Sequence, residues 1–375
     1  MRHVVIYRQP GRYAGWPANY GIWSWGDEIV VGFTLGYHKS DAGFHTRDRA
    51  RPFVGMQARS VDGGETWDVH ETPCRAPGAR GLSADEHMRP ELGVGKALTE
   101  GDDLPDCPGG VDFSDPDFAL MCARSGLREG ARSWFYFSTD RCHTWQGPFG
   151  LPMFGQPGIA ARTDYLVSGS DTCTLFLTAA KRNGEEGRVF CARTQDGAKT
   201  FSFLSWIGDE PVGFAIMPAS VRLPFPSLEG YAKRGVGSRI LVATRCREGN
   251  RALGTAQNWI DLYASDDEGE TWQYMSRPVE NTGVGGNPPT LTRLQDGRLC
   301  LTYGFRDAPH SIRAKLSEDN GATWSPDVML RNDGGNHDIG YPRTVQRTDG
   351  HMVTVYYFND RPDGERYIAA TIWKP

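Results

Sequence analysis

Residues 60–67 read Ser-Val-Asp-Gly-Gly-Glu-Thr-Trp, and four further segments repeat this pattern of Ser or Thr, Asp and Thr followed by an aromatic residue. The copies occupy residues 138–145, 194–201, 265–272 and 317–324. In such a segment the Ser and Asp oxygens can accept backbone N–H groups, while the aromatic ring fills an apolar slot. The starts are 78, 56, 71 and 52 residues apart, which predicts one turn in each successive blade of a β-propeller.

The repeated segments are expected to be structural turns rather than sites. Cys142 and Ala198 stand where Gly64 stands in the first copy, so the turn tolerates other residues there. An Asp-x-x-Gly pattern is also found in calcium loops, but the full series of carboxylates of an EF-hand loop is missing. We therefore assign these segments to strand connections.

These turns are Asp boxes, and through them the chain resembles the sialidase (neuraminidase) superfamily. That resemblance implies an all-β, six-bladed propeller. Around the boxes, strand-like runs place five blades at about residues 21–70, 112–149, 159–206, 216–275 and 289–329. The last blade would contain residues 341–345, 351–358 and 366–373.

The ring is expected to close through the N-terminus. The run Val4–Tyr7 precedes the first blade, and joining it to the last blade would remove two open sheet edges. Residues 1–375 would then form a single propeller domain. A seven-bladed alternative needs strands hidden in residues 71–110, a stretch rich in Pro, Gly and charge whose length favours a functional loop. Residues 225–237 and 247–257 are expected to be surface loops.

Composition narrows the range of partners. A net charge of −5 argues against binding to nucleic acid or to an anionic membrane, because both attract basic surfaces. No apolar stretch approaches the roughly 18 residues needed to span a bilayer. The start, Met1–Tyr7, lacks the apolar core of a signal peptide, which indicates the cytoplasm. None of the eight cysteines forms a CxxC pair, so we expect buried reduced thiols, no metal and no cofactor.

Blade topology predicts where a site would lie. Asp boxes join the third and fourth strands of a blade, so they mark one face of the propeller. Loops that follow second strands or precede first strands lie on the opposite face, where binding residues are expected. Polar and aromatic residues at those positions should line a pocket near the axis; they are Trp16, His38, His45, Asp48, Arg162, Arg245, Asn287, Arg306, His337, Asp338 and Tyr341.

The sialidase resemblance implies roles for four of these residues. Arg245 and Arg306 match the second and third arginines that bind the substrate carboxylate in sialidases. Tyr341 matches the tyrosine nucleophile, and Asp48 is the candidate general acid/base. His45 is a second candidate for moving the proton, since histidine alone serves this purpose in some propeller enzymes.

Two departures separate this chain from true sialidases. Residues 15–17 read Gly-Trp-Pro where an Arg-x-Pro motif is expected, which leaves Arg12 as the nearest substitute for the first arginine. Residues 217–220 contain no glutamate to activate the tyrosine phenol. A related glycosidase on the same scaffold is therefore favoured over sialidase activity.

Each candidate also has a structural alternative. Arg245 and Arg306 could pair with neighbouring acids, and Asp48 could belong to a solvated salt-bridge loop. His38, His45 and His337 could together bind a metal. Trp16 could stack on a sugar ring or pack in the core.

The sequence thus predicts a glycoside hydrolase that removes a terminal, acidic sugar from a glycan. Asn287, His337, Asp338, His38, Trp16 and Arg12 would contact the carbohydrate. The alternatives are a polysaccharide lyase or rhamnosidase-type enzyme on the same scaffold, and a non-catalytic carbohydrate-binding propeller.

Overall fold

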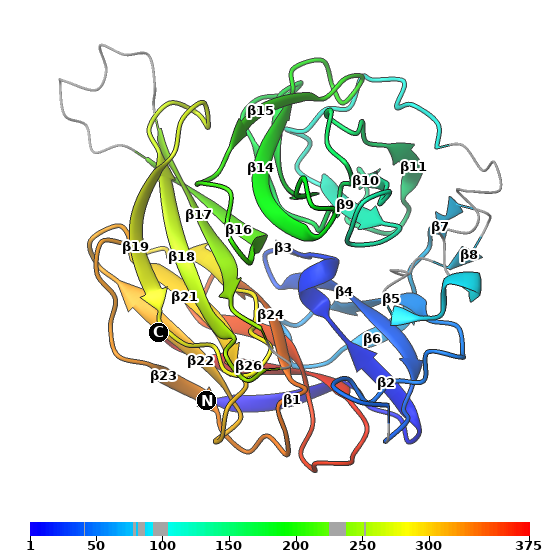
Figure 1. The fold of residues 1–375 in the computed structure, drawn as a ribbon, viewed down its shortest axis with the longest axis vertical. Coiled ribbons are helices and arrows are strands. Elements are labelled where there is room, and N and C mark those ends of the chain that lie inside the picture. Colours follow the sequence, from blue (N-terminus) through cyan, green and yellow to red (C-terminus); the bar gives the residue numbers. More distant parts are fainter. Residues whose placement is uncertain (41, 78–79, 82–86, 93–103, 225–237, 251–252) are drawn as a thin grey trace.

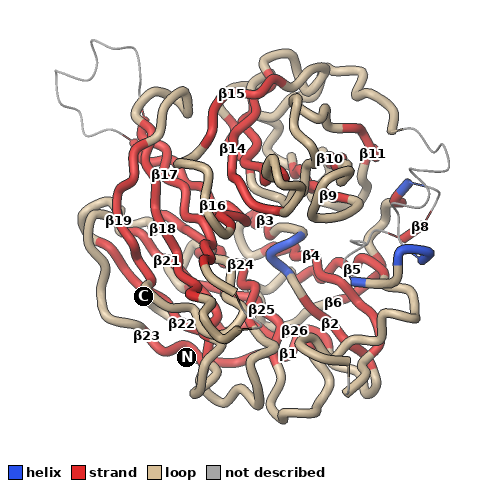
Figure 2. The backbone as a smooth tube through the Cα atoms, viewed as in Figure 1, coloured by secondary structure: helices blue, strands red, loops and turns tan. Residues whose placement is uncertain are grey.

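Six antiparallel sheets are arranged around a central axis in the computed structural model of the protein (Figure 1). The structure describes residues 1–375 except 41, 78–79, 82–86, 93–103, 225–237 and 251–252. Strands account for the regular structure of the described residues, and helix is confined to short segments such as η1 (Pro17–Asn19) and η4 (Pro90–Leu92) (Figure 2). The prediction of an all-β, six-bladed propeller is confirmed.

The first three blades follow one another along the chain. Blade 1 contains β2 (Arg12–Gly15), β3 (Ile22–Trp25), β4 (Glu28–Tyr37), β5 (Val54–Ser60) and β6 (Asp68–Glu71). Blade 2 contains β9 (Ala119–Arg124), β10 (Ser133–Ser138) and β11 (Gln146–Gly150). Blade 3 contains β12 (Tyr165–Val167), β13 (Cys173–Ala180), β14 (Glu186–Thr194) and β15 (Ser202–Trp206).

Two further blades have the regular four-stranded form. Blade 4 contains β16 (Phe214–Pro224), β17 (Ser238–Glu248), β18 (Gln257–Ser265) and β19 (Gln273–Val279). Blade 5 contains β20 (Thr290–Arg293), β21 (Leu299–Phe305), β22 (Ser311–Ser317) and β23 (Val328–Arg331).

Blade 6 closes the ring with both ends of the chain. It contains β24 (Gly340–Gln346), β25 (Met352–Phe358), β26 (Tyr367–Trp373) and the N-terminal β1 (Arg2–Tyr7), in the order β1-β26-β25-β24. The pairing of β1 with β26 is antiparallel, so the first and last strands of the protein lie side by side, as predicted. Because the ring is closed, each blade packs against a neighbouring blade on both of its faces.

Blade 1 departs from the predicted boundaries. It begins at β2 rather than near residue 21, because β2 and β3 both pair with β4 and together make its first strand. Within the described part of residues 71–110, β7 (Arg75–Ala76) pairs with β8 (Arg80–Gly81) in a two-stranded sheet, which is too small for a seventh blade. Residues 225–237, expected to be a surface loop, lie outside the described residues.

The apolar strands are explained by how the blades pack. Every residue of β13, β25 and β26 is buried. Neighbouring blades cover both faces of these strands, so they read as continuous apolar runs instead of alternating patterns.

Among the described residues, no helix is long and apolar enough to cross a membrane. All eight cysteines are unpaired; Cys74 is half-buried and the others are buried.

Each Asp box is a small hydrogen-bonded unit between the last two strands of its blade. In the first box Ser60 Oγ accepts the Gly64 N–H at 2.8 Å, and Asp62 Oδ1 accepts the Thr66 N–H at 2.9 Å. The Thr66 hydroxyl donates to Asp62 Oδ2 at 2.5 Å. The same bonds recur in the other four boxes. Cys142 and Ala198 adopt the left-handed conformation taken by glycine elsewhere, with φ of 65° and 67°.

We expect the substitution Asp62→Ala to lower the free energy of unfolding by about 1–2 kcal/mol at pH 7, because it removes charge-assisted bonds at a solvent-exposed turn. Although burial opposes it, hydrogen bonding from Thr66 and Ser60 lowers the pKa of Asp62 to about 2. The stabilisation is therefore complete above pH 4 and lost as the pH falls towards 2. Urea unfolding at pH 7 and pH 2.5 measures both effects. The control Asp68→Ala removes an exposed carboxylate outside the box, and an equal loss in this control would contradict the prediction.

Candidate functional site

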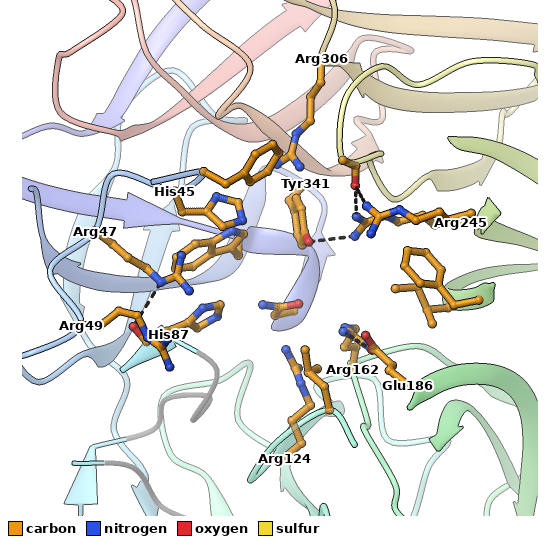
Figure 3. Close-up of a pocket in the computed structure, with 18 of the residues that line it drawn as sticks. His45, Arg47, Arg49, His87, Arg124, Arg162, Glu186, Arg245, Arg306 and Tyr341 are labelled. Carbon is orange, nitrogen blue, oxygen red and sulfur yellow. Dashed lines mark hydrogen bonds and ion pairs between the residues drawn. The ribbon is translucent and has the colours of Figure 1, made fainter. Parts of the chain in front are cut away.

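A cavity of about 440 Å³ opens near the axis of the propeller. It is lined by Tyr341 at the start of β24, by Arg245 near the end of β17 and by Arg306 just after β21. The Asp boxes of blades 4 and 5 lie at the opposite ends of those blades, after β18 and β22. The cavity is therefore on the face that blade topology predicted, with the labelled side chains converging on it in Figure 3.

The buried side-chain amide of Asn287 orients Tyr341 towards the cavity. The Tyr341 N–H donates to Asn287 Oδ1 at 2.8 Å, and Asn287 Nδ2 donates to the Ile339 carbonyl at 2.9 Å. Tyr341 has a φ of 50°, at an irregularity in the pairing of β24 with β25. Gly340 permits the close approach, since a Cβ atom there would lie 2.3 Å from Asn287 Nδ2. Asn287, fully buried, thus positions Tyr341 from behind.

The Tyr341 phenol lies between two arginines. Arg245 Nη1 donates to the phenol oxygen at 2.9 Å, and the Arg306 guanidinium carbon is 5.5 Å from the ring centroid. Burial alone would raise the pKa of Tyr341, but the charges of Arg245, Arg306 and Arg162 outweigh it and leave the pKa below its usual value. The phenolate form is therefore more accessible here than in an ordinary tyrosine.

Both arginines are held by backbone carbonyls. Arg306, 1% exposed, donates to the Ile339 carbonyl at 3.0 Å and to the Gly286 carbonyl at 2.9 Å. Arg245 donates to the Gly285 carbonyl. Carbonyl acceptors fix the two guanidinium groups without neutralising them, so their charge remains to act on Tyr341 or on an anionic ligand.

A histidine–aspartate pair lies next to the phenol. His45, on the loop between β4 and β5, lines the cavity with a side chain that is 20% exposed, whereas Asp338 behind it is 0% exposed. His45 Nδ1 and Asp338 Oδ1 are 2.6 Å apart. Asp338 also accepts the Tyr357 hydroxyl at 2.8 Å and the Arg366 Nε–H at 3.1 Å.

The protonation states of this pair follow from burial and charge. Burial would raise the pKa of Asp338, but the charges of His45, Arg366 and Arg306 hold it well below its usual range. Burial lowers the pKa of His45 to about 4, although Asp338 opposes this. At neutral pH the pair is therefore a carboxylate that accepts the Nδ1–H of a neutral imidazole, and His45 Nε2 keeps its lone pair.

The rest of the lining is strongly basic. Seven arginines and a single acidic residue, Glu186, are found among the described lining residues. Glu186 accepts from Arg162 Nη2 at 2.7 Å. Figure 3 shows Arg124 and Arg162 across the cavity from Arg306. Such a lining favours an anionic ligand.

Six of the residues predicted for this face line the cavity: Trp16, His45, Arg162, Arg245, Arg306 and Tyr341. Asn287 and Asp338, predicted to contact substrate, instead lie behind the lining because each is fully buried and bonded to a lining residue. The His87 imidazole stacks on one face of the Trp16 indole, with 3.8 Å between the ring centroids and an angle of 2° between the ring planes. That face cannot also stack on a sugar.

The other four predicted residues do not line the cavity. His337 Nε2 contacts the Phe44 carbonyl at 2.9 Å, and His38 forms an isolated backbone bridge with Arg47. Arg12 Nε donates to the Gly36 carbonyl at 2.8 Å. Asp48 Oδ1 accepts the Ala50 N–H at 3.0 Å, so its carboxylate caps its own loop. Within the described residues, no group of three His, Cys, Asp or Glu side chains could hold a metal ion.

Several lining residues were not predicted as site residues, among them Arg124 and His87. Arg124 is the last residue of β9, and β9 pairs with β10 as the second strand of a blade pairs with the third. Arg124 therefore lies at the end of a second strand, and applying the topological rule to blade 2 would have found it. His87 lies in the long connection after blade 1, where the sequence shows no periodicity from which to place it.

Comparisons with known proteins identify the fold. No sequence-family model matches the chain, and a search of curated proteins gives no match. Among solved structures, a protein of unknown function from Dyadobacter fermentans is 20% identical with a TM-score of 0.69, covering 99% of this chain and 97% of that one. The NanB sialidase from Streptococcus pneumoniae is 10% identical with a TM-score of 0.61, covering 99% of this chain and 70% of that one.

An α-L-arabinofuranosidase from Fusarium graminearum is also similar, at 12% identity and a TM-score of 0.59, covering 100% of this chain and 98% of that one. At these identities the likeness is one of fold. The chain therefore has the propeller fold of sialidases and of this arabinofuranosidase.

Tyr341 is expected to ionise at a lower pH than an ordinary tyrosine, because the charges of Arg245 and Arg306 favour its phenolate. Ultraviolet titration of the folded protein from pH 7 to 11 should show an early phenolate step that Tyr341→Phe abolishes. Tyr274→Phe is the control, since burial raises the pKa of Tyr274 and its loss should leave the early step in place. An early step that persists in Tyr341→Phe would contradict the assignment.

Proposed function

We propose that this protein is an exo-acting glycoside hydrolase that removes a terminal, carboxylate-bearing sugar from a glycan. The observation that carries the proposal is the Tyr341 phenol, held between Arg245 and Arg306 in a cavity that His45 also lines. The sialidase and arabinofuranosidase with the same propeller support the general class, because both are glycosidases by name.

Arg245 and Arg306 are suited to binding the sugar carboxylate. A guanidinium group offers paired N–H donors that match the two oxygens of a carboxylate. Both groups lie at Tyr341. In a 2-keto sugar acid such as sialic acid, where the carboxylate is attached to the anomeric carbon, binding the carboxylate would therefore place the anomeric carbon near the phenol. The remaining arginines of the lining raise the local positive potential and attract an anionic substrate.

Tyr341 acts as the nucleophile in this proposal. Its phenolate attacks the anomeric carbon, the glycosidic C–O bond breaks, and the leaving oxygen takes the Nε2 proton of His45 in its protonated form. Water then attacks the anomeric carbon while His45 Nε2 accepts a proton from that water, which releases the sugar and restores the phenolate. Arginine charge replaces the glutamate that activates the tyrosine in sialidases.

We assign the proton transfer to His45 rather than to Asp48. His45 lines the cavity, and its Nδ1 is engaged by Asp338, which leaves Nε2 as the nitrogen available to the substrate. Asp338 has the role of a positioning residue that fixes the ring and its tautomer. The Asp48 carboxylate caps its own loop.

Tyr341→Phe and His45→Gln should each lower kcat on the true substrate by about 10²–10⁴-fold, because each removes a group that acts in the reaction. Aryl glycosides of sialic, glucuronic and galacturonic acid are suitable substrates for the measurement. Asp48→Asn is the matched control and should keep activity within about twofold. Full activity in Tyr341→Phe, or loss of activity in Asp48→Asn alone, would overturn this assignment.

A polysaccharide lyase is the second candidate. It is favoured by the neutral state of His45 at neutral pH, which follows from a pKa of about 4. Neutral His45 could take the proton from C5 of a uronate while Tyr341 gives its phenolic proton to the leaving oxygen. The C4–O bond then breaks, and a C4–C5 double bond forms. Arg245 and Arg306 would stabilise the charge that develops on the uronate carboxylate. The product of such a reaction absorbs in the ultraviolet.

The products should separate the two reactions, because their pH profiles coincide. The hydrolase needs the Tyr341 phenolate with protonated His45, and the lyase needs the Tyr341 phenol with neutral His45, so each needs one proton on the pair. In either case kcat/KM should rise towards pH 4, where His45 titrates, stay level, and fall once Tyr341 ionises. An ultraviolet-absorbing product indicates the lyase, and release of a free acidic sugar without that absorbance indicates the hydrolase. A kcat/KM that falls steadily above pH 4 would contradict both mechanisms.

A further inference from the structure

We propose that a groove along blade 4 binds neutral sugar units of the glycan chain that carries the acidic terminal sugar. The proposal rests on the proposed function, because it names the part of the substrate that lies beyond the cleaved bond. It assigns a second binding region to blade 4 and predicts a substrate whose two parts differ in charge.

The groove begins at the rim of the arginine-lined cavity. It has a volume of about 460 Å³. Residues 208–213, which connect β15 to β16, form one side of it, and residues of β16, β17, β18 and β19 form the rest. Phe214 and Arg247 line both the cavity and the groove. A chain attached to a sugar in the cavity can therefore pass over these two residues into the groove. Figure 1 shows β19 at the outer edge of blade 4.

Aromatic side chains give the groove a surface suited to sugar rings. Trp259, Tyr263, Trp272 and Tyr274 all line it. Tyr274 is 57% exposed and stands edge-on to Tyr263, with 5.9 Å between the ring centroids. Val212, on the facing loop, is 84% exposed. Apolar side chains gathered in a groove mark a binding surface, and Trp and Tyr combine an apolar face with a polar tip.

The charge of the groove is opposite to that of the cavity. Four of its described lining residues are acidic and two are arginines. Asp261 pairs with Arg277 at 2.8 Å, whereas Asp209, Glu210 and Glu248 are exposed. Exposed carboxylates accept hydrogen bonds from sugar hydroxyls and repel sugars that bear a carboxylate or sulfate. The occupant that fits this surface is a run of neutral sugars.

Charge then sets the direction in which the substrate binds. An acidic terminal sugar is attracted to the arginines of the cavity and repelled from the groove, while the neutral chain suits the groove. A uniformly acidic polysaccharide fits the cavity but not the groove. The favoured substrate class is a neutral oligosaccharide chain capped by an acidic sugar.

Calorimetric binding of neutral tetrasaccharides tests the groove without any turnover. The probes are tetramers of β-1,4-linked glucose, β-1,4-linked galactose and α-1,5-linked arabinose. At least one should bind the wild-type protein, and Tyr274→Ala should raise its Kd about fivefold to tenfold, which corresponds to loss of one aromatic contact. Val212→Ala should weaken binding, whereas the matched control Val61→Ala, 71% exposed on blade 1, should not.

The proposal is overturned if no tetramer binds the wild-type protein, or if Tyr274→Ala and Val61→Ala bind it equally well. Cleavage of acidic aryl monoglycosides is measured in parallel and reports only the cavity, where Tyr274→Ala should change kcat/KM by less than about twofold. If these glycosides are not cleaved while the tetramers bind in a Tyr274-dependent manner, the proposed function fails and the groove stands.

Discussion

The buried carboxylate of Asp338 is the interaction on which both the closure of the propeller and the geometry of the site depend. It accepts from Tyr357 and Arg366 of blade 6, and from Tyr13 and His45 of blade 1. A charge with no exposure to water is tolerable only when its partners are all in place, and removing one leaves an uncompensated buried charge. The contact that joins the first and last blades therefore also fixes the imidazole.

A second buried pair, Arg343 and Asp164, connects blades 1, 3, 4 and 6 near the axis. Arg343 of blade 6 donates to the Ala18 carbonyl at 2.8 Å, and its Nη1 lies 4.0 Å from Asp164, which precedes blade 3. Asp164 in turn accepts the Ser220 N–H of blade 4 at 3.1 Å. Four regions of the ring thus share one polar network. Side chains held in this way need little rearrangement when a ligand binds, which is the condition for electrostatic stabilisation of a transition state.

The distribution of charge gives the two parts of the binding surface different tasks. Arginines concentrate around Tyr341, although the protein as a whole carries a net charge of −5. The adjoining groove is acidic and aromatic, with Phe214 and Arg247 at the boundary. An anion is attracted only to the cavity, so orientation of a substrate follows from long-range charge before any close contact forms.

The amino-acid sequence by itself determined the propeller, because each Asp box is built from bonds within eight residues, such as Asp62 to Thr66. It also led to Tyr341, Arg245 and Arg306, since the box fixes which strand ends share a face. Only the tertiary structure decided that Asp338 lies behind His45, a contact between residues 293 positions apart. The same holds for the groove, where loop 208–213 meets the outer strands of blade 4. Distances between remote residues depend on how the blades pack, and no local pattern records them.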